Sequence, residues 1–327
     1  MKVLFIGGTG NISTAVSRLC VQRGMDLYLL NRGRRGVEIP GAKLLQGDIT
    51  DARATAALLE GHHWDVVVNW IAYIESEVRR DMALFRGRTK QYIFISSAST
   101  YEKPLRHPVV TESTPLCNPF WEYSRNKIAC EEALVQAWRA EGFPMTIVRP
   151  SHTYDTIIPA LIGSGSEYTL IDRMQRGEKV IVHGDGTSLW TLTHTEDFAI
   201  GFAGLMGNPQ AIGDVFHITS DESLNWNQIF QIMGEAAGVE PKIVHIPSDF
   251  ICAREPDLSG TLLGDKAYSV LFDNSKIKRF VPEYRAVIPF REGFRRTMAW
   301  FAADPARRVI NPETNTVMDR ILQAYER

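Results

Sequence analysis

The chain has 327 residues, of which 44% are hydrophobic and 23% are charged, as in ordinary globular proteins. Its net charge of −2 indicates no general affinity for nucleic acid, so nucleic acid is not expected as a partner. No apolar run approaches the roughly 20 residues of a membrane span, and residues 1–6 lead directly into glycines without a secretory signal. We therefore expect a cytoplasmic protein with no membrane partner.

The four cysteines are scattered along the chain and form neither a CxxC pair nor a cluster with histidines at ligand spacing; they are Cys20, Cys117, Cys130 and Cys252. This pattern is typical of free thiols in a reducing compartment. The sequence accordingly predicts no disulfide framework and no bound metal.

A glycine turn follows the first apolar run of the chain. Residues 2–6 read as a buried strand, residues 7–13 carry three glycines, and helical spacing continues through Val16, Leu19 and Cys20. Glycines allow the backbone to approach a pyrophosphate, and a helix N-terminus supplies N–H groups and a positive dipole end. The order strand, glycine turn, helix therefore predicts dinucleotide binding, with Ser13 at the position where a third glycine would give the closest packing.

The end of the second predicted strand, residues 27–30, indicates which dinucleotide is preferred. A site that prefers NAD places Asp or Glu here, on the ribose 2'-hydroxyl, but this chain has Asn31 followed by arginines at positions 32, 34 and 35. A guanidinium suits a 2'-phosphate, so we favour NADP over NAD, with Arg32 as the best single candidate. The alternative is a solvated basic loop without a ligand.

Strands and helices then alternate along the chain. Strands are predicted at residues 43–46, 65–69 and 92–95, and helices at residues 51–59 and 75–85. This alternation predicts an α/β fold with a doubly wound, Rossmann-type parallel sheet, in which ligands bind at the carboxyl ends of the strands. The serines of residues 96–99 follow the fifth strand, where their hydroxyls could lie beside a bound carbonyl or alcohol.

Tyr123 and Lys127 stand four residues apart at the start of a predicted helix that continues to about residue 140. At this spacing both side chains lie on one helix face. A nearby ammonium would favour the phenolate and lower the pKa of the tyrosine towards neutrality. Because this spacing is common in helices, the pair indicates proton transfer only together with the rest of the chain.

The later half of the chain departs from the regular alternation. A polar loop over residues 102–119 precedes the helix of Tyr123 and Lys127. A sixth strand is predicted at residues 145–148 and a seventh at 215–218. Helices are expected at 170–176, 198–206, 226–237 and 290–301, the last of them as the terminal helix. We expect a dinucleotide-binding domain over residues 1–155, to which about 190–220 return. A smaller, interleaved C-terminal lobe would bind substrate, with residues 156–189 and 221–327.

These features together resemble the extended short-chain dehydrogenase/reductases, the superfamily of sugar epimerases and dehydratases. The resemblance is carried by the glycine turn, Ser97, the Tyr123 and Lys127 pair, and the motif Arg149-Pro150 followed by Tyr154. It extends to residues 184–186, 194–197 and 273–276, and so covers nearly the whole chain.

The resemblance implies a role for each matching residue. Tyr123 would exchange a proton with a substrate hydroxyl or carbonyl, Lys127 would hold the nicotinamide ribose, and Ser97 would hydrogen-bond the reacting oxygen. The remaining cofactor contacts would come from the pyrophosphate turn, the adenine pocket and two further strand ends: Gly7, Thr9, Gly10, Asn11, Ile12, Asp48, Ile49, Trp70, Ile71, Ala72, Pro150 and His152.

Departures from the superfamily pattern limit the reaction and the substrate. Ala98-Ser99 replaces the Asp-Glu pair of the dehydratases, which makes sugar dehydration an unfavoured reaction. Trp190-Thr191 replaces the Arg-Asp of nucleotide-sugar enzymes, whose arginine grips the diphosphate. Ser99 also stands where some deoxysugar epimerase-reductases carry a cysteine. Cys117 in the nearby loop could take the place of that cysteine, but we expect Cys117 to be a buried, inert thiol.

The sequence thus predicts an NADP- or NAD-dependent oxidoreductase or epimerase, of the dehydrogenase or reductase type, acting on a secondary alcohol or ketone of a carbohydrate-like substrate. Ser99 and three aromatic residues, Phe120, Trp121 and Trp190, are candidates for the substrate wall, although core packing explains the aromatic residues equally well. A homodimer is expected by resemblance. The alternatives are a nucleotide-sugar epimerase and a non-catalytic RNA-binding or cofactor-sensing Rossmann protein, since the short segment between Ala72 and Tyr92 resembles that of an RNA-binding branch.

Overall fold

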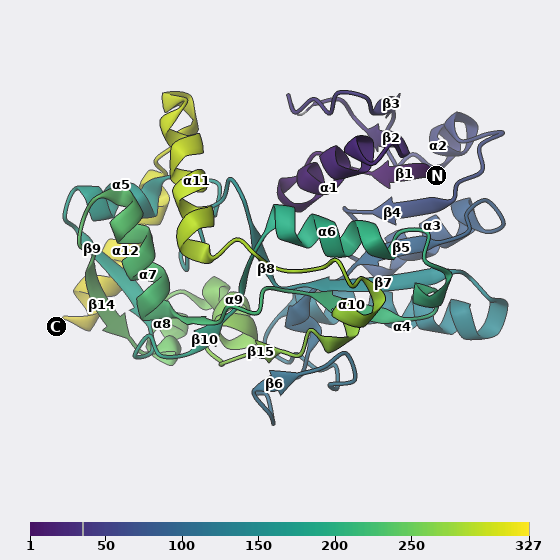
Figure 1. Ribbon diagram of the computed structural model, residues 1–327. Helices are drawn as coiled ribbons and strands as arrows, with labels where there is room; N and C mark the ends of the chain where they lie inside the picture. The colour runs from purple at the N-terminus through teal and green to yellow at the C-terminus, as the bar shows by residue number, and fades with distance from the viewer. Residues whose placement is uncertain (35, 327) are drawn as a thin grey trace.

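The main sheet of the protein has seven strands, all of them parallel (Figure 1). The computed structural model describes residues 1–34 and 36–326, so Arg35, one of the arginines assigned to the basic loop, lies outside the described residues. Across the sheet the strands run β12 (Val215–Ile218), β7 (Met145–Pro150), β5 (Tyr92–Ile95), β4 (Val66–Asn69), β1 (Lys2–Ile6), β2 (Asp26–Asn31) and β3 (Lys43–Gln46). The predicted Rossmann-type α/β fold is confirmed.

Both faces of the sheet are covered by helices, which explains why its strands are continuous apolar runs. Val3 and Phe5 of β1 enter one core, while Leu4 and Ile6 enter the core on the opposite face. The helices α1 (Asn11–Gln22), α6 (Thr195–Leu205) and α10 (Ser275–Phe280) pack together on the first face, and α2 (Ala52–Leu58), α3 (Glu75–Phe85) and α4 (Glu122–Glu141) on the second.

The direction of winding reverses at β1. The chain proceeds from β1 to β2 and β3 on one side and returns to β4, β5, β7 and β12 on the other. Ile6, the last residue of β1, lies opposite Leu30 of β2 and Asn69 of β4. In doubly wound sheets ligands bind at such a reversal, outside the carboxyl ends of the strands.

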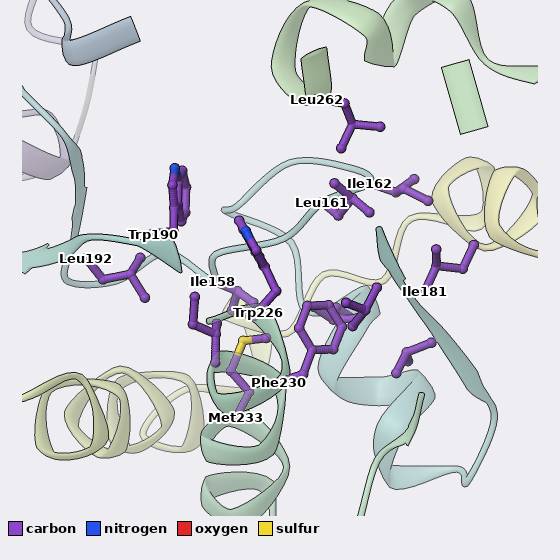
Figure 2. Close-up of a cluster of buried hydrophobic side chains, with 14 of the residues drawn as sticks. Ile158, Leu161, Ile162, Ile181, Trp190, Leu192, Trp226, Phe230, Met233 and Leu262 are labelled. Atoms are coloured by element: carbon purple, nitrogen blue, oxygen red, sulfur yellow. The ribbon is translucent and has the colours of Figure 1, made fainter. Parts of the chain in front are cut away.

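A second hydrophobic core lies in the C-terminal part of the chain. It is built from α5 (Thr169–Gln175), β9 (Lys179–His183), α7 (Trp226–Ala237), β14 (Lys242–Ile246), α8 (Ser248–Arg254), α11 (Phe290–Ala302) and α12 (Pro312–Tyr325). Trp190 and Trp226 lie next to each other in this core, above Ile158 and Met233 (Figure 2). Because β12 joins the main sheet, the chain does return to the first domain late in the sequence. The division at the stated residue bounds stays a prediction.

Short paired strands connect the two parts. They are β6 (Val109–Val110) with β15 (Leu271–Phe272), β8 (His152–Tyr154) with β11 (Leu192–His194), and β10 (Leu189–Trp190) with β13 (Leu224–Asn225). The turns α9 (Ser259–Thr261) and a π-helical turn at Leu262–Lys266, here called η4, lie between α8 and β15. These segments connect the C-terminal part to the sheet domain.

Two predictions about helices are wrong. The helix at residues 290–301 is not terminal, because α12 follows it, starting at the Asn311 cap and burying Met318, Ile321 and Leu322. The helix predicted from residue 198 begins at Thr195, since the Nδ1 of His194 accepts a hydrogen bond from the N–H of Glu196 and caps the helix. In the described part of the chain, no helix is both long and apolar enough to span a membrane.

Candidate active site

The glycine turn lies at the reversal point of the sheet. Gly7 and Gly8 both have positive φ angles, +97° and +95°, which a residue with a side chain rarely adopts. A Cβ on Gly8 would lie 2.6 Å from Leu29, and one on Gly7 would lie 3.2 Å from Ile71 in the turn after β4. The turn after β1 therefore lies close to β2 and to the turn after β4. Glycine at positions 7 and 8 leaves the backbone of this turn free of side chains, so that a ligand could approach it.

The N-terminus of α1 is held in place by its own side chains. Ser13 accepts a hydrogen bond from the N–H of Gly10 at 2.8 Å, which explains why serine is tolerated at the third glycine position. The Nδ2 of Asn11 donates to the carbonyl oxygen of Thr153 at 2.8 Å, so α1 is tied to β8. The Oδ1 of Asn11 is buried and has no hydrogen-bond partner among the described residues, which leaves an acceptor for a hydroxyl of a ligand.

Helix α4 carries Tyr123 and Lys127 to the edge of the sheet. The Oδ1 of Asn118 accepts hydrogen bonds from the N–H groups of Phe120 and Trp121, both at 3.2 Å, and this turn directs the chain into the helix. The Nζ of Lys127 is buried and donates to the carbonyl oxygens of Ala72 at 2.6 Å and Ile95 at 2.8 Å. Lys127 thus connects the ends of β4 and β5 beneath the tyrosine.

The pKa of Tyr123 differs from the sequence-based expectation. Burial raises the pKa of the phenol to about 12, and an interaction with Ser97 offsets only part of that rise. Burial also lowers the pKa of the Lys127 ammonium to about 8. The phenol is therefore protonated at neutral pH in this structure, and the expected lowering by Lys127 is not observed.

A chain of hydroxyl groups lies beside the phenol. The Oγ atoms of Ser97 and Ser99 are 2.9 Å apart, and the buried Ser124 donates to the Oγ of Ser99 at 2.7 Å. Ser99 also donates its N–H to the Oγ of Ser97 at 3.2 Å. The structure thus brings Ser97 and Ser99 together with Tyr123, and Ser99 orients Ser97; direct contact of Ser99 with substrate stays a prediction.

The residues predicted to bind the adenosine part of the dinucleotide lie at the carboxyl ends of β2 and β3. The guanidinium of Arg32 is exposed and lies 3.8 Å from the carboxylate of Asp48. Hydrogen bonds from Thr50 lower the pKa of Asp48, with smaller contributions from Arg32 and Arg34. Asn31 accepts a hydrogen bond from the N–H of Gly33 at 2.8 Å and shapes this turn, while Ile49 is buried next to it.

The other predicted cofactor residues line the same edge of the sheet. Trp70 packs between Phe5 and Phe202, and Ala72 is tied to Lys127. Pro150 ends β7, and the ring of His152 lies 4.8 Å from that of Trp190. Burial lowers the pKa of His152 to about 3, so this ring is neutral at physiological pH.

The three aromatic candidates for the substrate wall have different environments. The ring of Trp121 lies 4.9 Å from that of Tyr123, and Phe120 is 37% exposed. Trp190, in contrast, is only 2% exposed and stacks on Trp226 at 4.7 Å (Figure 2). Trp121 thus lies beside Tyr123, whereas Trp190 packs in the second core; contact of any of them with substrate stays a prediction.

Two residues at and after the end of β4 were not identified as site candidates from the sequence. The ring of Tyr73 lies 6.3 Å from that of Tyr123 and 4.7 Å from the Nζ of Lys127, and the residue is 50% exposed. Asn69 accepts a hydrogen bond from the N–H of Ile71 and donates to the buried carboxylate of Asp81, so it shapes the turn after β4. Asn69 ends an apolar strand, and a polar residue there was an available signal.

The prediction for Cys117 is wrong, because this thiol is exposed rather than buried; the other three cysteines are buried, and all four are free. The loop turns Cys117 outwards while its N–H donates to the carbonyl oxygen of Thr100. Among residues 1–34 and 36–326, no group of three or more His, Cys, Asp or Glu residues could hold a metal ion.

Comparison with known proteins agrees with this geometry. Residues 3–84 and 82–219 match the model of the NAD dependent epimerase/dehydratase family. The chain belongs to this family. Its curated relatives include reductases, epimerases and dehydratases.

Individual relatives align with most of the chain. The 2'-dehydrokanamycin reductase of Streptomyces kanamyceticus is 22% identical over 286 residues, covering 87% of this chain and 80% of the reductase. The chloroplast stem-loop binding protein of 41 kDa b of Arabidopsis thaliana is 28% identical over 266 residues, covering 76% and 67%. The structure of UDP-glucose 4-epimerase from Bifidobacterium longum in complex with NAD+ and UDP matches with a TM-score of 0.75 at 18% identity, covering 93% of this chain and 99% of the epimerase.

The residues of this epimerase/dehydratase family member fit a nicotinamide dinucleotide. The glycine turn and the start of α1 offer backbone N–H groups for the pyrophosphate, and the unpartnered Oδ1 of Asn11 offers an acceptor. Arg32 and Asp48 stand at one end of this edge and Lys127 with Tyr123 at the other. A dinucleotide lying across the strand ends would present its nicotinamide next to the phenol.

Proposed function

We propose that the protein is an NADP-preferring oxidoreductase or epimerase acting on a secondary alcohol or ketone of a carbohydrate-like substrate that lacks a nucleoside diphosphate. The observation that carries the proposal is the meeting of Tyr123, Lys127 and Ser97 beside the glycine turn. Neither a glycine-rich turn nor a tyrosine–lysine pair, taken alone, identifies a nicotinamide-dependent enzyme. Their convergence at the reversal point of a doubly wound sheet favours proton transfer next to a nicotinamide.

In this proposal each residue has a defined task. Tyr123 donates its proton to the carbonyl oxygen of a ketone, or takes the proton of an alcohol in the reverse direction. Ser97 hydrogen-bonds the same oxygen, and Lys127 holds ribose hydroxyls and the ends of β4 and β5. The bound nicotinamide supplies the hydride chemistry. The raised pKa of the phenol suits its role as the proton donor in ketone reduction.

The substrate class rests on two departures from the nucleotide-sugar enzymes. Ala98 and Ser99 provide no carboxylates for dehydration, and Trp190 stands where an arginine would grip a diphosphate. The similarity to a Streptomyces reductase whose named substrate, 2'-dehydrokanamycin, is not a nucleotide sugar supports this view. Tight binding of UDP- or dTDP-sugars would overturn it in favour of a nucleotide-sugar epimerase.

Analysis of the nucleotide carried by the purified protein tests the proposal. An epimerase retains its nicotinamide between turnovers and would release NADP or NAD on denaturation, whereas a dehydrogenase or reductase would exchange it freely in solution. We expect saturable binding of NADP with NAD bound more weakly. A protein that carries no nucleotide and binds neither form would contradict the enzyme assignment.

A second candidate function is RNA binding, which is favoured by the similarity to the Arabidopsis stem-loop binding protein. The Ser97, Tyr123 and Lys127 set and the net charge of −2 count against it. Titration of labelled stem-loop RNA at two salt concentrations decides between them, because sub-micromolar affinity with a steep salt dependence would reverse the ranking. A non-catalytic cofactor sensor, the homodimer and the cytoplasmic location all remain predictions.

A further inference from the structure

One buried carboxylate on α3 has no part in the proposed reaction. Asp81 is 0% exposed, and its Oδ2 accepts hydrogen bonds from the Nδ2 of Asn69 and, at 2.7 Å, from the hydroxyl of Tyr92. The guanidinium of Arg80 donates to the Oδ1 at 3.0 Å. A buried carboxylate costs free energy unless its oxygens are paired, and here both are. Asp81 therefore connects α3 to the two central strands β4 and β5.

Asn69 extends this connection to the turn after β4. Its side chain is 1% exposed, and its amide has a donor side and an acceptor side. The Nδ2 donates to Asp81, while the Oδ1 accepts a hydrogen bond from the N–H of Ile71 at 2.8 Å. Only one orientation of the amide makes both contacts. The carboxylate thus sets the orientation of the Asn69 amide, and the amide fixes the start of the turn.

A second carboxylate of α3 holds the other end of the same turn. The Oε2 of Glu77 accepts hydrogen bonds from the N–H of Tyr73 at 2.6 Å and from that of Ile74 at 3.3 Å. Glu77 and Asp81 are four residues apart and so lie on one face of α3. Residues 69–74 are therefore fastened to α3 at both ends, with Ala72 between the two attachments.

Ala72 is the residue at which this turn meets α4. Its carbonyl oxygen accepts a hydrogen bond from the Nζ of Lys127 at 2.6 Å, and the carbonyl oxygen of Ile95 accepts a second at 2.8 Å. An ammonium has three N–H donors, so these two acceptors set the direction of the third. Ile71 of the same turn lies next to the glycine turn, since a Cβ on Gly7 would be 3.2 Å from its side chain.

We propose that Asp81, acting through Asn69, is a positioning residue of the active site that holds the carbonyl oxygen of Ala72 in place for Lys127. The inference rests on the proposed function, in which Lys127 holds the ribose of the nicotinamide nucleotide. Displacement of the turn would remove one of the two acceptors of the ammonium and redirect the N–H that is left for the ribose. An apolar side chain at position 81 would fill the same space but would not orient the Asn69 amide.

NMR titration of protein labelled at lysine Cε, with Lys127→Met for assignment, tests the inference without any nucleotide. Burial lowers the pKa of Lys127 to about 8 in the parent protein. Loss of the Ala72 acceptor disfavours the charged ammonium, so Asn69→Leu should lower the pKa of Lys127 further, by about one. Asp81→Asn should lower this pKa in the same direction by a smaller amount, because the amide keeps one acceptor oxygen.

The Asp81 variant also separates positioning from a direct effect of charge. The groups whose charges act on Lys127 are Cys130, Glu77 and Glu131, and Asp81→Asn leaves all three in place. A lower pKa of Lys127 in this variant therefore reports a displaced acceptor. Asp81→Asn preserves the size of the side chain, so it decides the question if Asn69→Leu does not fold.

Gln91→Leu is the matched control. Gln91 is another buried amide bonded to the backbone, but it precedes β5 at the opposite end of the sheet, where its Oε1 accepts from the N–H of Gly207 at 2.7 Å. This variant should lose stability as Asn69→Leu does, measured by urea denaturation, and leave the pKa of Lys127 unchanged. An unchanged pKa in both Asn69→Leu and Asp81→Asn would overturn the inference, as would an equal fall in Gln91→Leu.

Fluorescence titration with NADPH on the same samples connects the inference to the proposed function. Asn69→Leu should weaken NADPH binding by about ten-fold, as expected for loss of a hydrogen bond to a charged group, and Gln91→Leu should not. A parent protein that binds no NADPH would contradict the proposed function, whatever the titration of Lys127 shows. Binding of NADPH by the parent with an unaltered pKa of Lys127 in both variants would contradict the positioning role of Asp81 alone.

Discussion

Lys127 and Tyr123 lie one turn apart on α4, with the Nζ of Lys127 5.7 Å from the centre of the Tyr123 ring. The ammonium donates instead to the carbonyl oxygens of Ala72 and Ile95. It is therefore held mainly by the ends of β4 and β5. In this arrangement burial decides the protonation of the phenol, and the lysine secures the strand ends next to it.

The first prediction concerns this phenol. In the protein alone, Tyr123 should remain protonated through neutral pH, since burial raises its pKa to about 12. Ser97→Ala should raise the pKa further, because the Ser97 interaction is the main effect that lowers it. NMR of protein labelled at tyrosine Cζ, with Tyr123→Phe for assignment, measures both. Titration of Tyr123 between pH 6 and 8 would contradict the structure.

The second prediction concerns nucleotide choice. Arg32→Ala should weaken NADP binding by about ten-fold or more, the usual range for loss of a hydrogen bond to a charged group, and leave NAD binding nearly unchanged. Arg86→Ala is the control, because its exposed guanidinium pairs with Glu141 at the far end of α4. Fluorescence titration with NADPH and NADH measures both affinities. Equal losses for the two nucleotides would exclude Arg32 as the ligand of the 2'-phosphate.

The third prediction separates the two tryptophans. Trp190→Ala should destabilise the protein by about 3–5 kcal/mol, because it removes a buried ring that stacks on Trp226. Trp121→Ala should cost less stability, since Trp121 is only half-buried, and should weaken substrate binding instead. Urea denaturation compares the two variants. A smaller loss of stability for Trp190→Ala than for Trp121→Ala would place Trp190 outside the core.

The fourth prediction concerns acid stability. Burial lowers the pKa of His152 to about 3 and that of His183 to about 4, whereas both titrate near 6.5 in the unfolded chain. The unfolded chain therefore binds more protons below pH 6.5, so these histidines stabilise the fold above that pH and the contribution is lost as the pH falls. Between pH 6.5 and 5 the loss should be about 2 kcal/mol per histidine.

Denaturant titrations at these two pH values test the acid-stability prediction. His183→Gln should reduce the difference in unfolding free energy between pH 6.5 and 5. If the difference is the same in His183→Gln as in the parent protein, this histidine is not neutral in the folded state.

Local patterns predicted the first half of the fold well. The apolar runs at β1, β4 and β5, the glycine turn and the spacing of Tyr123 and Lys127 are all visible in the sequence, because each depends on neighbours within a few residues. The raised pKa of Tyr123, the exposure of Cys117 and the stacking of Trp190 on Trp226 were not visible. These properties depend on contacts between segments far apart in the chain, which spacing does not specify.

The buried lysines illustrate the same limit. Lys103 and Lys266 are separated by about half of the chain and resemble ordinary surface lysines in the sequence, yet the fold buries both side chains. Only the fold places η4 against the loop after β5, through the hydrogen bonds of Asn118. The α12 helix, in contrast, was predictable in part, since Asn311-Pro312 is a helix-start signal and Met318, Ile321 and Leu322 share one face.

The most direct test of the central claim compares the parent protein with Tyr123→Phe in NADP binding and in turnover of the best substrate from a panel of carbohydrates and sugar acids. The account predicts unchanged nucleotide affinity, because the ring is preserved, and a loss of turnover of at least 100-fold, because no proton donor remains. Turnover is followed as the change in reduced nucleotide. Full activity in Tyr123→Phe would contradict the proposed proton transfer.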